Sequence, residues 1–513
     1  MSRSQILIVG AGPTGLVLAL CLAHHGIKLR IIDKNSGPGQ ASRAMAVQAR
    51  TLEFYRQLGF ADEVVALGIK MERLHLRESG QDIASLSFQD MGGGLSPYPF
   101  MLCFPQDDHE RFLVEKLQAA GVEVEWGVAL QHFSQDEAGV RAVLDKGGSV
   151  ETCETGWLCG CDGAHSRVRH GLEIAFPGGT YDQMFYVADV GIAGHGGHDM
   201  FANLSRNGFL LMLPVRSRGM QRLIGIVPQQ LAGHASLTFE DIRPGAEAIL
   251  GMHVTQVNWF STYFVHHRVA GQFQRGRCFL AGDAAHVHSP AGGQGMNTGI
   301  GDAVNLAWKL AHVAQGRADA AILDSYGQER IAFARKLVAT TDKIFQAMVG
   351  KGLGSRLLRT WLLPHLMPML TRLASMRRSL FMMVSQLRIS YRGSALGSGS
   401  AGLHGGDRLP WVPSPDDGNF DALVAMDWQL HVYGRATPDL TAAADAMDLP
   451  LKIFAFSASA GQAGLKRDAA YLVRPDGYIA LAMADQNAGE LRQWARKLGL
   501  KFGRGQIAAR LAD

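Results

Sequence analysis

The pattern of hydrophobic and polar positions changes several times along the chain. Residues 5–33 begin with an apolar run over 5–9, continue through a Gly-rich turn into an apolar stretch over 14–25, and end in a second apolar run over 29–33. Short buried strands joined by a helix are typical of a βαβ unit in a parallel sheet. The pattern therefore predicts an α/β, Rossmann-like unit at the start of the chain.

Two later regions have a different pattern. Residues 70–103 and 181–270 alternate apolar and polar positions in short runs, such as 185–192, 209–215 and 222–227, which Gly-rich turns separate. Alternation with a period of two is typical of an antiparallel sheet with one buried face. Because α/β segments precede, separate and follow these regions, we expect a first domain that is interrupted by the sheet.

The second half of the chain is expected to be helical first and mixed afterwards. Residues 300–348 have a helical pattern, 350–391 are rich in Leu, Met, Arg and Ser, and 394–406 form a Gly/Ser-rich linker. The Met-rich segment is expected to pack as core or lid, with a membrane-surface helix as the alternative. A separate small domain is predicted from strands over 423–433 and 451–456, a hairpin over 471–481 that turns at Pro475, Asp476 and Gly477, and a closing helix over 488–498.

Composition narrows the class of protein. Of the 513 residues, 47% are hydrophobic and 19% charged, and the net charge of +4 is weak and not concentrated in a basic run, which disfavours nucleic-acid binding. The six cysteines are expected to be reduced thiols, because Cys159 and Cys161 lack the spacing of a redox or zinc pair. The apolar run 6–23 is broken by glycines and a proline, so no targeting or membrane segment is expected and the predicted location is the cytoplasm.

The first Gly-rich turn has the spacing of a dinucleotide fingerprint. Gly10 permits a tight turn, Gly12 lets the backbone approach a pyrophosphate, and Gly15 lets the helix and strand pack closely. Asp33, at the end of the second strand, is placed to accept hydrogen bonds from a ribose hydroxyl. Nucleotide binding is therefore predicted here.

A second Gly-rich turn follows the short apolar strand that ends at Gly282 and Asp283. Together the two turns indicate two ends of one large cofactor, a flavin. Backbone N–H groups of Gly295, Met296 and Asn297, at a helix start, are expected to point at the negative charge of reduced flavin. A partly buried anion there gains up to about 2 kcal/mol, roughly a thirtyfold bias. No metal site is predicted, and the nearby His286 is expected to be a structural histidine.

Three segments together resemble the group A FAD-dependent aromatic hydroxylases, the para-hydroxybenzoate hydroxylase and phenol hydroxylase family. They are Gly10-x-Gly12-x-x-Gly15, Cys161-Asp162-Gly163 with Ser166 and Arg169, and Gly282-Asp283. The resemblance covers roughly residues 1–400, and the remainder resembles the thioredoxin-like appendage of phenol-hydroxylase-type members, here without cysteines. It implies a discontinuous FAD-binding domain (1–75, 104–180 and 271–345), a substrate-binding sheet domain (76–103 and 181–270), a helical segment and linker (346–400) and a thioredoxin-like domain (401–513).

The same resemblance assigns roles to individual residues. Asp283 is expected to bind the ribityl chain of FAD, and Asp162 and Gly163 to lie near the pyrophosphate and contribute to nicotinamide-nucleotide binding. The other implied contacts are Arg43 and Gln106 with FAD, Gln48 and Arg50 as further FAD candidates, Pro290 on the face where oxygen meets flavin C4a, and Arg222 near the flavin.

These features predict an NAD(P)H- and O2-dependent flavoprotein monooxygenase that hydroxylates a phenolic or polyketide-type aromatic substrate through a flavin C4a-hydroperoxide. A Baeyer–Villiger-type oxygenase acting on a polycyclic ketone, a flavin reductase or halogenase, and a non-catalytic FAD-binding scaffold remain alternatives. Without a second Gly-x-Gly-x-x-Gly unit, NADH or NADPH is expected to dock transiently. Met45 stands where phenol hydroxylase has a likely base, so the base is open among Tyr186, Tyr263 and His267 or an already acidic substrate. Monomer and homodimer both remain open.

Overall fold

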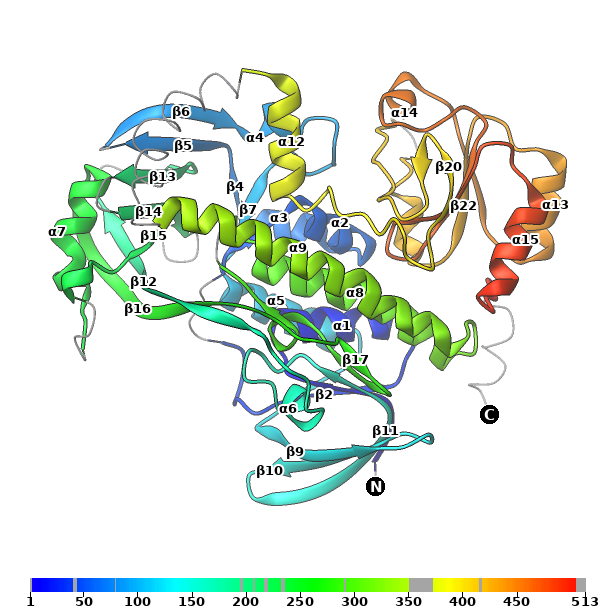
Figure 1. The fold of residues 1–513 in the computed structure, drawn as a ribbon, viewed down its shortest axis with the longest axis horizontal. Helices are drawn as coiled ribbons and strands as arrows, with labels where there is room; N and C mark the ends of the chain where they lie inside the picture. The colour runs from blue at the N-terminus through cyan, green and yellow to red at the C-terminus, as the bar shows by residue number, and fades with distance from the viewer. Residues whose placement is uncertain are drawn as a thin grey trace.

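The computed structural model describes most of the chain. It covers residues 2–39, 44–78, 80–193, 197–205, 208–215, 220–231, 236–289, 292–349, 372–414 and 418–503. Figure 1 shows three parts in a row: a sheet with helix α7 at one end, an α/β core in the middle, and the carboxy-terminal domain at the other end. The predicted α/β fold class, with a Rossmann-like domain and an inserted sheet, is confirmed.

The middle part is built on an eight-stranded sheet. Its strands follow the order β17-β18-β11-β1-β2-β8, with β10 and β9 continuing from β11. The pairs from β18 to β8 are all parallel, as a Rossmann-like unit requires. The strands are β1 (Ser2–Val9), β2 (Leu29–Asp33), β8 (Val124–Trp126), β9 (Val128–Gln135), β10 (Val140–Lys146), β11 (Ser149–Gly160), β17 (Gln274–Arg275) and β18 (Cys278–Leu280).

Helices cover this sheet. The first helix, α1 (Pro13–His24), packs against α8 (Gly295–Ala314) and α5 (Gln106–Ala119). Residues 297–312 of α8 are buried, because the helix lies between the sheet and the carboxy-terminal domain. Shorter helices complete this part: α2 (Ala49–Gln57), α3 (Ala61–Leu67) and α6 (Arg167–Gly171).

The inserted part is a second eight-stranded sheet, in the order β19-β16-β12-β15-β14-β13-β5-β6. All its pairs are antiparallel except β13 with β5, so the sheet is mixed. Helix α7 (Phe239–Leu250) packs on it, and their contact forms a separate apolar core. The strands are β5 (Arg73–Glu78), β6 (Gln81–Ser87), β12 (Gly178–Ile192), β13 (Met200–Ser205), β14 (Gly208–Val215), β15 (Met220–Ile226), β16 (Val254–Val269) and β19 (His286–Val287).

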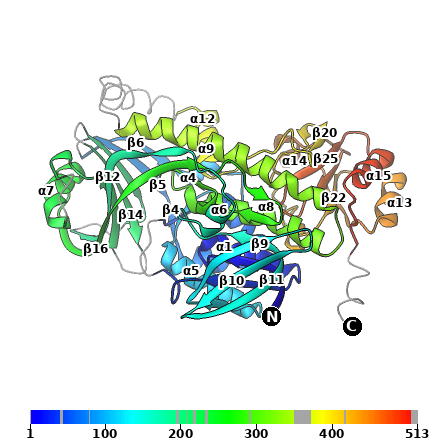
Figure 2. The same ribbon diagram turned by 60° about the horizontal axis from the view of Figure 1, so that its bottom comes forward.

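Smaller elements join the two sheets. The predicted helical stretch 300–348 is two helices, α8 and α9 (Asp324–Val349), with a 3-10 turn at Ala320–Leu323 between them. Figure 2 shows α9 crossing from the inserted sheet toward the carboxy-terminal domain. A short three-stranded sheet consists of β3 (Ala46–Val47), β7 (Met101–Cys103) and β4 (Ile69–Met71). Helix α12 (Ala374–Val384) packs against α4 (Phe88–Gly92).

The carboxy-terminal domain corrects two predictions. Residues 422–425 form a 3-10 turn, so the predicted strand over 423–433 is only β22 (Gln429–Tyr433). The predicted linker 394–406 contains two strands of the domain's own sheet, β20 (Ser398–Ala401) and β21 (Leu403–His404). Glycine and serine there permit close backbone approach, since a Cβ on Gly405 would lie 2.0 Å from the Ser398 nitrogen.

The other strands of this domain agree with the sequence. Its sheet order is β21-β20-β25-β24-β22-β23, and the predicted hairpin is β24 paired with β25. The parallel pair β22 and β23 joined by α13, followed by the hairpin and α15, has the succession expected of the thioredoxin-like fold, which stays a prediction. The remaining elements are β23 (Leu451–Phe454), β24 (Ala470–Val473), β25 (Ile479–Met483), α13 (Pro438–Ala446), α14 (Ala458–Gln462) and α15 (Ala488–Lys497).

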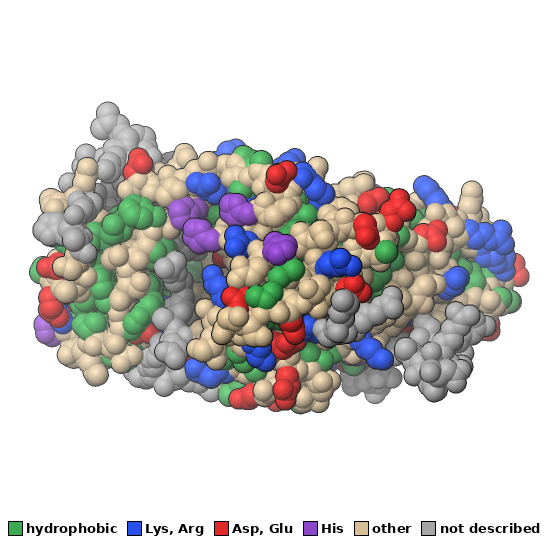
Figure 3. Space-filling view, turned by 90° about the horizontal axis from the view of Figure 1, so that it is seen from below, with side chains coloured by type: hydrophobic (Ala, Val, Ile, Leu, Met, Phe, Trp, Pro, Cys, Tyr) green, Lys and Arg blue, Asp and Glu red, His purple; other side chains and the backbone are tan. Residues whose placement is uncertain are grey.

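The molecular surface is mixed in charge. On the face drawn in Figure 3, basic and acidic side chains are interspersed rather than gathered by sign. Within the described ranges, no helix combines the length and the hydropathy that crossing a bilayer demands. All six cysteines carry free thiols.

Candidate functional site

A cavity of about 1740 Å³ lies between the α/β core, the inserted sheet and α9. Pockets that hold one small molecule measure roughly 300–1,000 Å³. This cavity therefore has room for two ligands, such as a large cofactor and a substrate. Both Gly-rich turns line it, although they are far apart in the sequence.

The glycines of the first Gly-rich turn have two different roles: two are required by close packing within the protein, and one leaves space for a ligand. Gly10 has a φ of +105°, and a Cβ there would lie 2.3 Å from the Cys161 carbonyl oxygen. A Cβ on Gly15 would lie 2.0 Å from the Gly10 carbonyl oxygen, so the fold itself requires these two glycines. A Cβ on Gly12 would meet no protein atom within 4 Å, and Gly12 lines the cavity. The space beside Gly12 is thus left for a ligand.

Asp33 and Gln106 lie on the β2 side of this turn. Asp33 accepts hydrogen bonds from the backbone N–H of Ala11 and of Asn35, both at 2.8 Å, and so holds the turn against β2. Gln106 begins α5, lines the cavity and donates to Glu110 Oε1 at 2.8 Å. Burial raises the pKa of Glu110, and the nearby Asp33 charge raises it further. Arg43 lies outside the described residues.

The turn after β11 forms the neighbouring wall. Asp162 Oδ2 accepts from the backbone N–H of Arg167 at 2.6 Å and of Val168 at 3.1 Å, which begins α6. Burial raises the pKa of Asp162, and its Oδ1 is buried with no hydrogen-bond partner among the described residues. Gly163 has a φ of +79°, lines the cavity, and would place a Cβ in open space. The turn therefore leaves free space for a ligand beside Gly163.

The second Gly-rich turn starts directly after β18. A Cβ on Gly282 would lie 2.5 Å from Thr14 Oγ1 of α1, so this glycine brings the two turns together. Asp283, the next residue, is exposed and lines the cavity. His286 Nε2 lies 2.6 Å from Asp302 Oδ2, and both groups are buried, which confirms a structural histidine.

The start of α8 also opens on the cavity. Gly295 and Met296 line it, and a Cβ on Gly295 would meet only His288 Nε2, at 3.9 Å. No side chain caps this helix at Gln294, and none caps α1 at Gly12. Two helix N-termini with uncapped N–H groups, which attract anions, therefore face one cavity. Pro290 lies outside the described residues.

The side chains of Asn297 and Gln48 make hydrogen bonds within the protein. Asn297 Oδ1 accepts from the Gln48 N–H at 2.9 Å and the Thr51 hydroxyl at 2.7 Å, and its amide donates to Ala46 and Gly293 carbonyls. The Gln48 amide donates to the Gly292 carbonyl at 3.0 Å. Neither side chain is among the described cavity-lining groups, so Asn297 would reach a ligand through its backbone.

The inserted sheet supplies an apolar wall. Phe185, Ile224, Trp259, Phe260 and Tyr263 face the cavity, as does the buried Met45 from the opposite side. The other two base candidates, Tyr186 and His267, are not among the described lining residues. Nor is Arg222, which is fully buried and donates to Asp189 through Nε at 2.7 Å and Nη2 at 2.9 Å. That Arg222 acts near the flavin stays a prediction.

Helix α9 braces the α8 end of the site, which the sequence pattern did not indicate. Arg330 donates to Asp302 Oδ1 at 2.6 Å, to the Thr298 carbonyl at 3.0 Å and to the Tyr391 hydroxyl at 2.8 Å. Burial alone would raise the pKa of Asp302, but the Arg330 and His286 charges hold it below its ordinary value. The spacing of apolar residues predicted that these helices are packed in the core. It did not predict the ion pairs between them, because no spacing along the chain indicates which charged side chains meet.

Buried ion pairs join the carboxy-terminal domain to this core. Arg474 of the hairpin donates to Glu329 of α9 at 2.7 Å and to Asp476 at 2.6 Å, while Lys309 of α8 donates to Glu329 at 2.9 Å. Arg50, a further FAD candidate, instead donates to Glu53 and to the Asp476 carbonyl, each at 2.7 Å. The predicted hairpin turn is therefore an internal contact rather than a solvated loop.

Comparisons with known proteins agree with this geometry. The family model described as "FAD binding domain" matches residues 3–341. The chain is 36% identical over 429 residues to 6-methylpretetramide 4-monooxygenase from Streptomyces rimosus, covering 78% of this chain and 73% of that protein. It is 34% identical over 364 residues to pentachlorophenol 4-monooxygenase from Sphingobium chlorophenolicum, covering 68% and 66%. A solved anhydrotetracycline hydroxylase, OxyS from Streptomyces rimosus, superposes with a TM-score of 0.78 at 28% identity, over 97% of this chain and 99% of that one.

Proposed function

This chain belongs to the FAD-binding-domain family of flavin-dependent monooxygenases, and we propose that it uses NAD(P)H and O2 to hydroxylate a polycyclic phenolic substrate. The observation that carries the substrate proposal is the cavity, which has two uncapped helix N-termini in one wall and an aromatic sheet in the other. Its α/β wall fits FAD, and its remaining volume fits a flat, apolar molecule.

The residues present fit FAD at several points. Gly12 and Gly163 leave open space beside the backbone, where a Cβ would otherwise stand. The N-terminus of α1 suits the pyrophosphate, and the N-terminus of α8 suits the charge of a reduced isoalloxazine. Asp283, exposed in the same cavity, suits the ribityl hydroxyls. FAD is accordingly assigned as the cofactor, with Asp33 at the adenosine end.

Bound FAD would supply the oxidation chemistry, accepting a hydride from NAD(P)H and activating O2 at its C4a position. The chain's own residues position and orient the cofactor and the substrate, and they exclude water from the site. The N–H groups of Gly295 and Met296 stabilise negative charge, and the aromatic sheet face keeps the substrate dry and flat against the cofactor. Position 45 carries a buried methionine rather than a carboxylate, so it provides an apolar contact and not a base.

A polycyclic substrate is favoured over a single ring. The cavity volume of about 1740 Å³ is well above what one small ligand requires, and Phe185, Trp259, Phe260 and Tyr263 give a broad aromatic surface. One similar protein, the anhydrotetracycline hydroxylase, is named for a tetracyclic compound, whereas another is named for a single-ring phenol. No specific observation favours the Baeyer–Villiger, reductase, halogenase or scaffold alternatives.

A substrate screen tests this proposal. Purified protein with FAD is mixed with NADH or NADPH, and coenzyme oxidation is followed with single-ring and with three- or four-ring phenols. We expect the larger phenols to stimulate oxidation most and to gain one oxygen atom by mass spectrometry with their rings intact. A lactone product, or no stimulation by any phenol, would contradict the proposal.

Asp283→Ala is expected to weaken FAD binding by roughly ten- to a hundredfold, because a charged hydrogen-bonding group is worth about 1.5–3 kcal/mol. Flavin fluorescence titration of the apoprotein measures the Kd. Asp439→Ala, at an exposed position in the first turn of α13, serves as the control and should leave the Kd unchanged. Full flavin retention in Asp283→Ala would refute the ribityl assignment.

A further inference from the structure

His288 stands in the cavity wall between Asp283 and the start of α8, and none of the roles above uses it. Its Nδ1 lies 2.8 Å from the Ser289 carbonyl oxygen. A carbonyl can only accept, so Nδ1 carries the hydrogen of this bond. In a neutral imidazole the other nitrogen then has no hydrogen and is a hydrogen-bond acceptor. The geometry therefore defines which way the His288 ring can interact.

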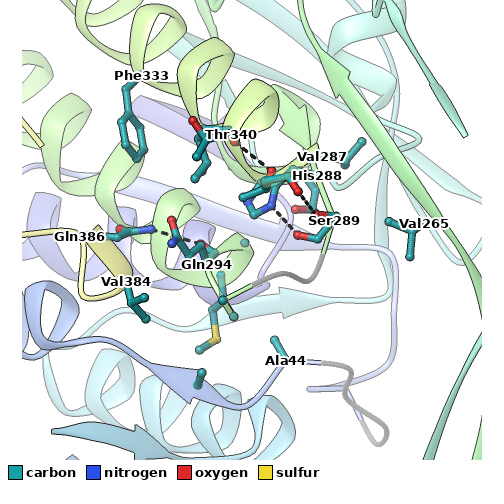
Figure 4. A pocket seen from close by; sticks show the side chains of 18 of the residues that line it. Ala44, Val265, Val287, His288, Ser289, Gln294, Phe333, Thr340, Val384 and Gln386 are labelled. Carbon is teal, nitrogen blue, oxygen red and sulfur yellow. Dashed lines mark hydrogen bonds between the residues drawn. The ribbon is translucent and has the colours of Figure 1, made fainter. Parts of the chain in front are cut away.

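The surroundings hold the ring in this state. Ser289 is buried, and its hydroxyl donates to the Thr341 carbonyl of α9 at 3.4 Å. Figure 4 shows the ring between Thr340 of α9 and Gln294 at the start of α8, with Ser289 beside it. Burial, reinforced by the His286 charge, lowers the pKa of His288 to about 4, so the ring is neutral near pH 7.

The acceptor nitrogen has no partner among the described residues. His288 Nε2 is buried and makes no hydrogen bond with any of the described residues, although His288 lines the cavity. Because Gly295 has no side chain, there is space beside His288 Nε2; a Cβ on Gly295 would lie 3.9 Å from this nitrogen. A buried acceptor without a partner is costly, and most such atoms in folded proteins are paired with protein, water or ligand.

We propose that His288 Nε2 accepts a hydrogen bond from an O–H or N–H group of a molecule bound in this cavity. Phosphate, carboxylate and carbonyl groups offer only acceptors, so they cannot be its partner. Two molecules carry suitable donors: FAD, through its ribityl hydroxyls or ring N–H, and a phenolic substrate, through its hydroxyl. The inference rests on the proposed function only for the second of these.

Two binding measurements distinguish the sources, and neither depends on turnover, so their failure is separate from failure of the proposed activity. The first is the Kd of FAD for the apoprotein, from flavin fluorescence. The second is the preference of the FAD-loaded protein for 2-naphthol over naphthalene, from perturbation of the flavin absorbance. The two probes differ only in the hydroxyl group, so their ratio isolates that hydrogen bond.

His288→Leu should lower either the affinity for FAD or the preference for 2-naphthol over naphthalene by roughly three- to tenfold. This is the usual effect of losing one net hydrogen bond. A loss of FAD affinity identifies the cofactor as donor, and a loss of the 2-naphthol preference identifies the substrate. His288→Gln, which keeps an acceptor oxygen at a similar reach, should stay within about twofold of the wild type.

Thr340→Val is the matched control. Thr340 lines the same wall, but its hydroxyl already donates to the Lys336 carbonyl at 2.8 Å, so the substitution removes no unpaired acceptor from the cavity wall. Thermal unfolding of each apoprotein checks the fold, and His288→Phe, with a ring of similar shape, replaces the leucine variant if that variant unfolds. The proposal is overturned if the apolar variant changes neither the FAD Kd nor the preference for 2-naphthol.

Discussion

Gly12→Val is expected to abolish tight FAD binding while leaving the apoprotein folded. No protein atom lies within 4 Å of a Cβ at this position, and Gly12 has a φ of −75° and a ψ of 179°, which any residue adopts. A valine side chain would occupy the space where a pyrophosphate meets the N-terminus of α1. Losing that contact alone is worth up to about 2 kcal/mol, so the FAD Kd should rise by roughly thirtyfold or more.

Gly15→Ala provides the opposite result at the same turn. Its Cβ would lie 2.0 Å from the Gly10 carbonyl oxygen, so this smaller change should lower the Tm of the apoprotein itself. Differential scanning fluorimetry without FAD, together with FAD titration, separates the two effects. A Gly12→Val protein that retained wild-type FAD affinity would show that the pyrophosphate does not bind at this turn.

Arg474→Met is expected to lower the free energy of unfolding by about 3–5 kcal/mol, because it leaves buried charges without a partner. Arg474 donates to both Glu329 and Asp476, and all three side chains are almost fully buried. Burial would raise the pKa of Glu329, but the Arg474 and Lys309 charges hold it well below its ordinary value. Urea-induced unfolding measures the change.

Arg435→Met is the control for this substitution, since Arg435 lies exposed in the same domain and should change the stability by no more than about 0.5 kcal/mol. The depressed pKa of Glu329 gives the sign of the pH dependence. Its contribution is fully present above the ordinary glutamate value of 4.5 and is lost as the pH falls below it. Arg474→Met should therefore lose less stability on acidification than the wild type. Equal stability of the two variants at pH 7 would contradict the buried ion pair.

The sequence predicted the parts of the site that obey local backbone rules. The steric roles of Gly10 and Gly15 follow from spacing, because a tight turn and a close helix–strand contact impose glycine wherever they occur. The strand ending at Asp33 and the helix beginning at Gly295 follow from periodicity and from the glycines that interrupt it. The hairpin turning at Pro475 to Gly477 follows from turn chemistry.

Long-range contacts were beyond the same rules. The residue types at Pro475 to Gly477 predict a turn but not its surroundings. In the structure Asp476 is buried and accepts hydrogen bonds from Asn305 and Trp308 of α8, because burial of a turn depends on which surface it meets. Residues 422–425 resemble a strand in composition but form a 3-10 turn, since no neighbouring strand pairs with them there. The Gly/Ser-rich stretch that resembles a linker supplies β20 and β21, because small residues also permit close backbone pairing.

By itself, then, the sequence determined the α/β class, the two Gly-rich turns and the FAD cofactor. Each turn depends on residues close together in the chain, and the cofactor was inferred from the two turns taken together. Only the tertiary structure decided what the side chains between those turns do. It showed that Asn297 and Gln48 make hydrogen bonds within the protein and that Arg222 pairs with Asp189. It also showed that His288 Nε2, in the cavity wall, has no partner among the described residues. The physical reason is that hydrogen-bond saturation and burial are set by neighbours from distant segments, which spacing along the chain does not encode.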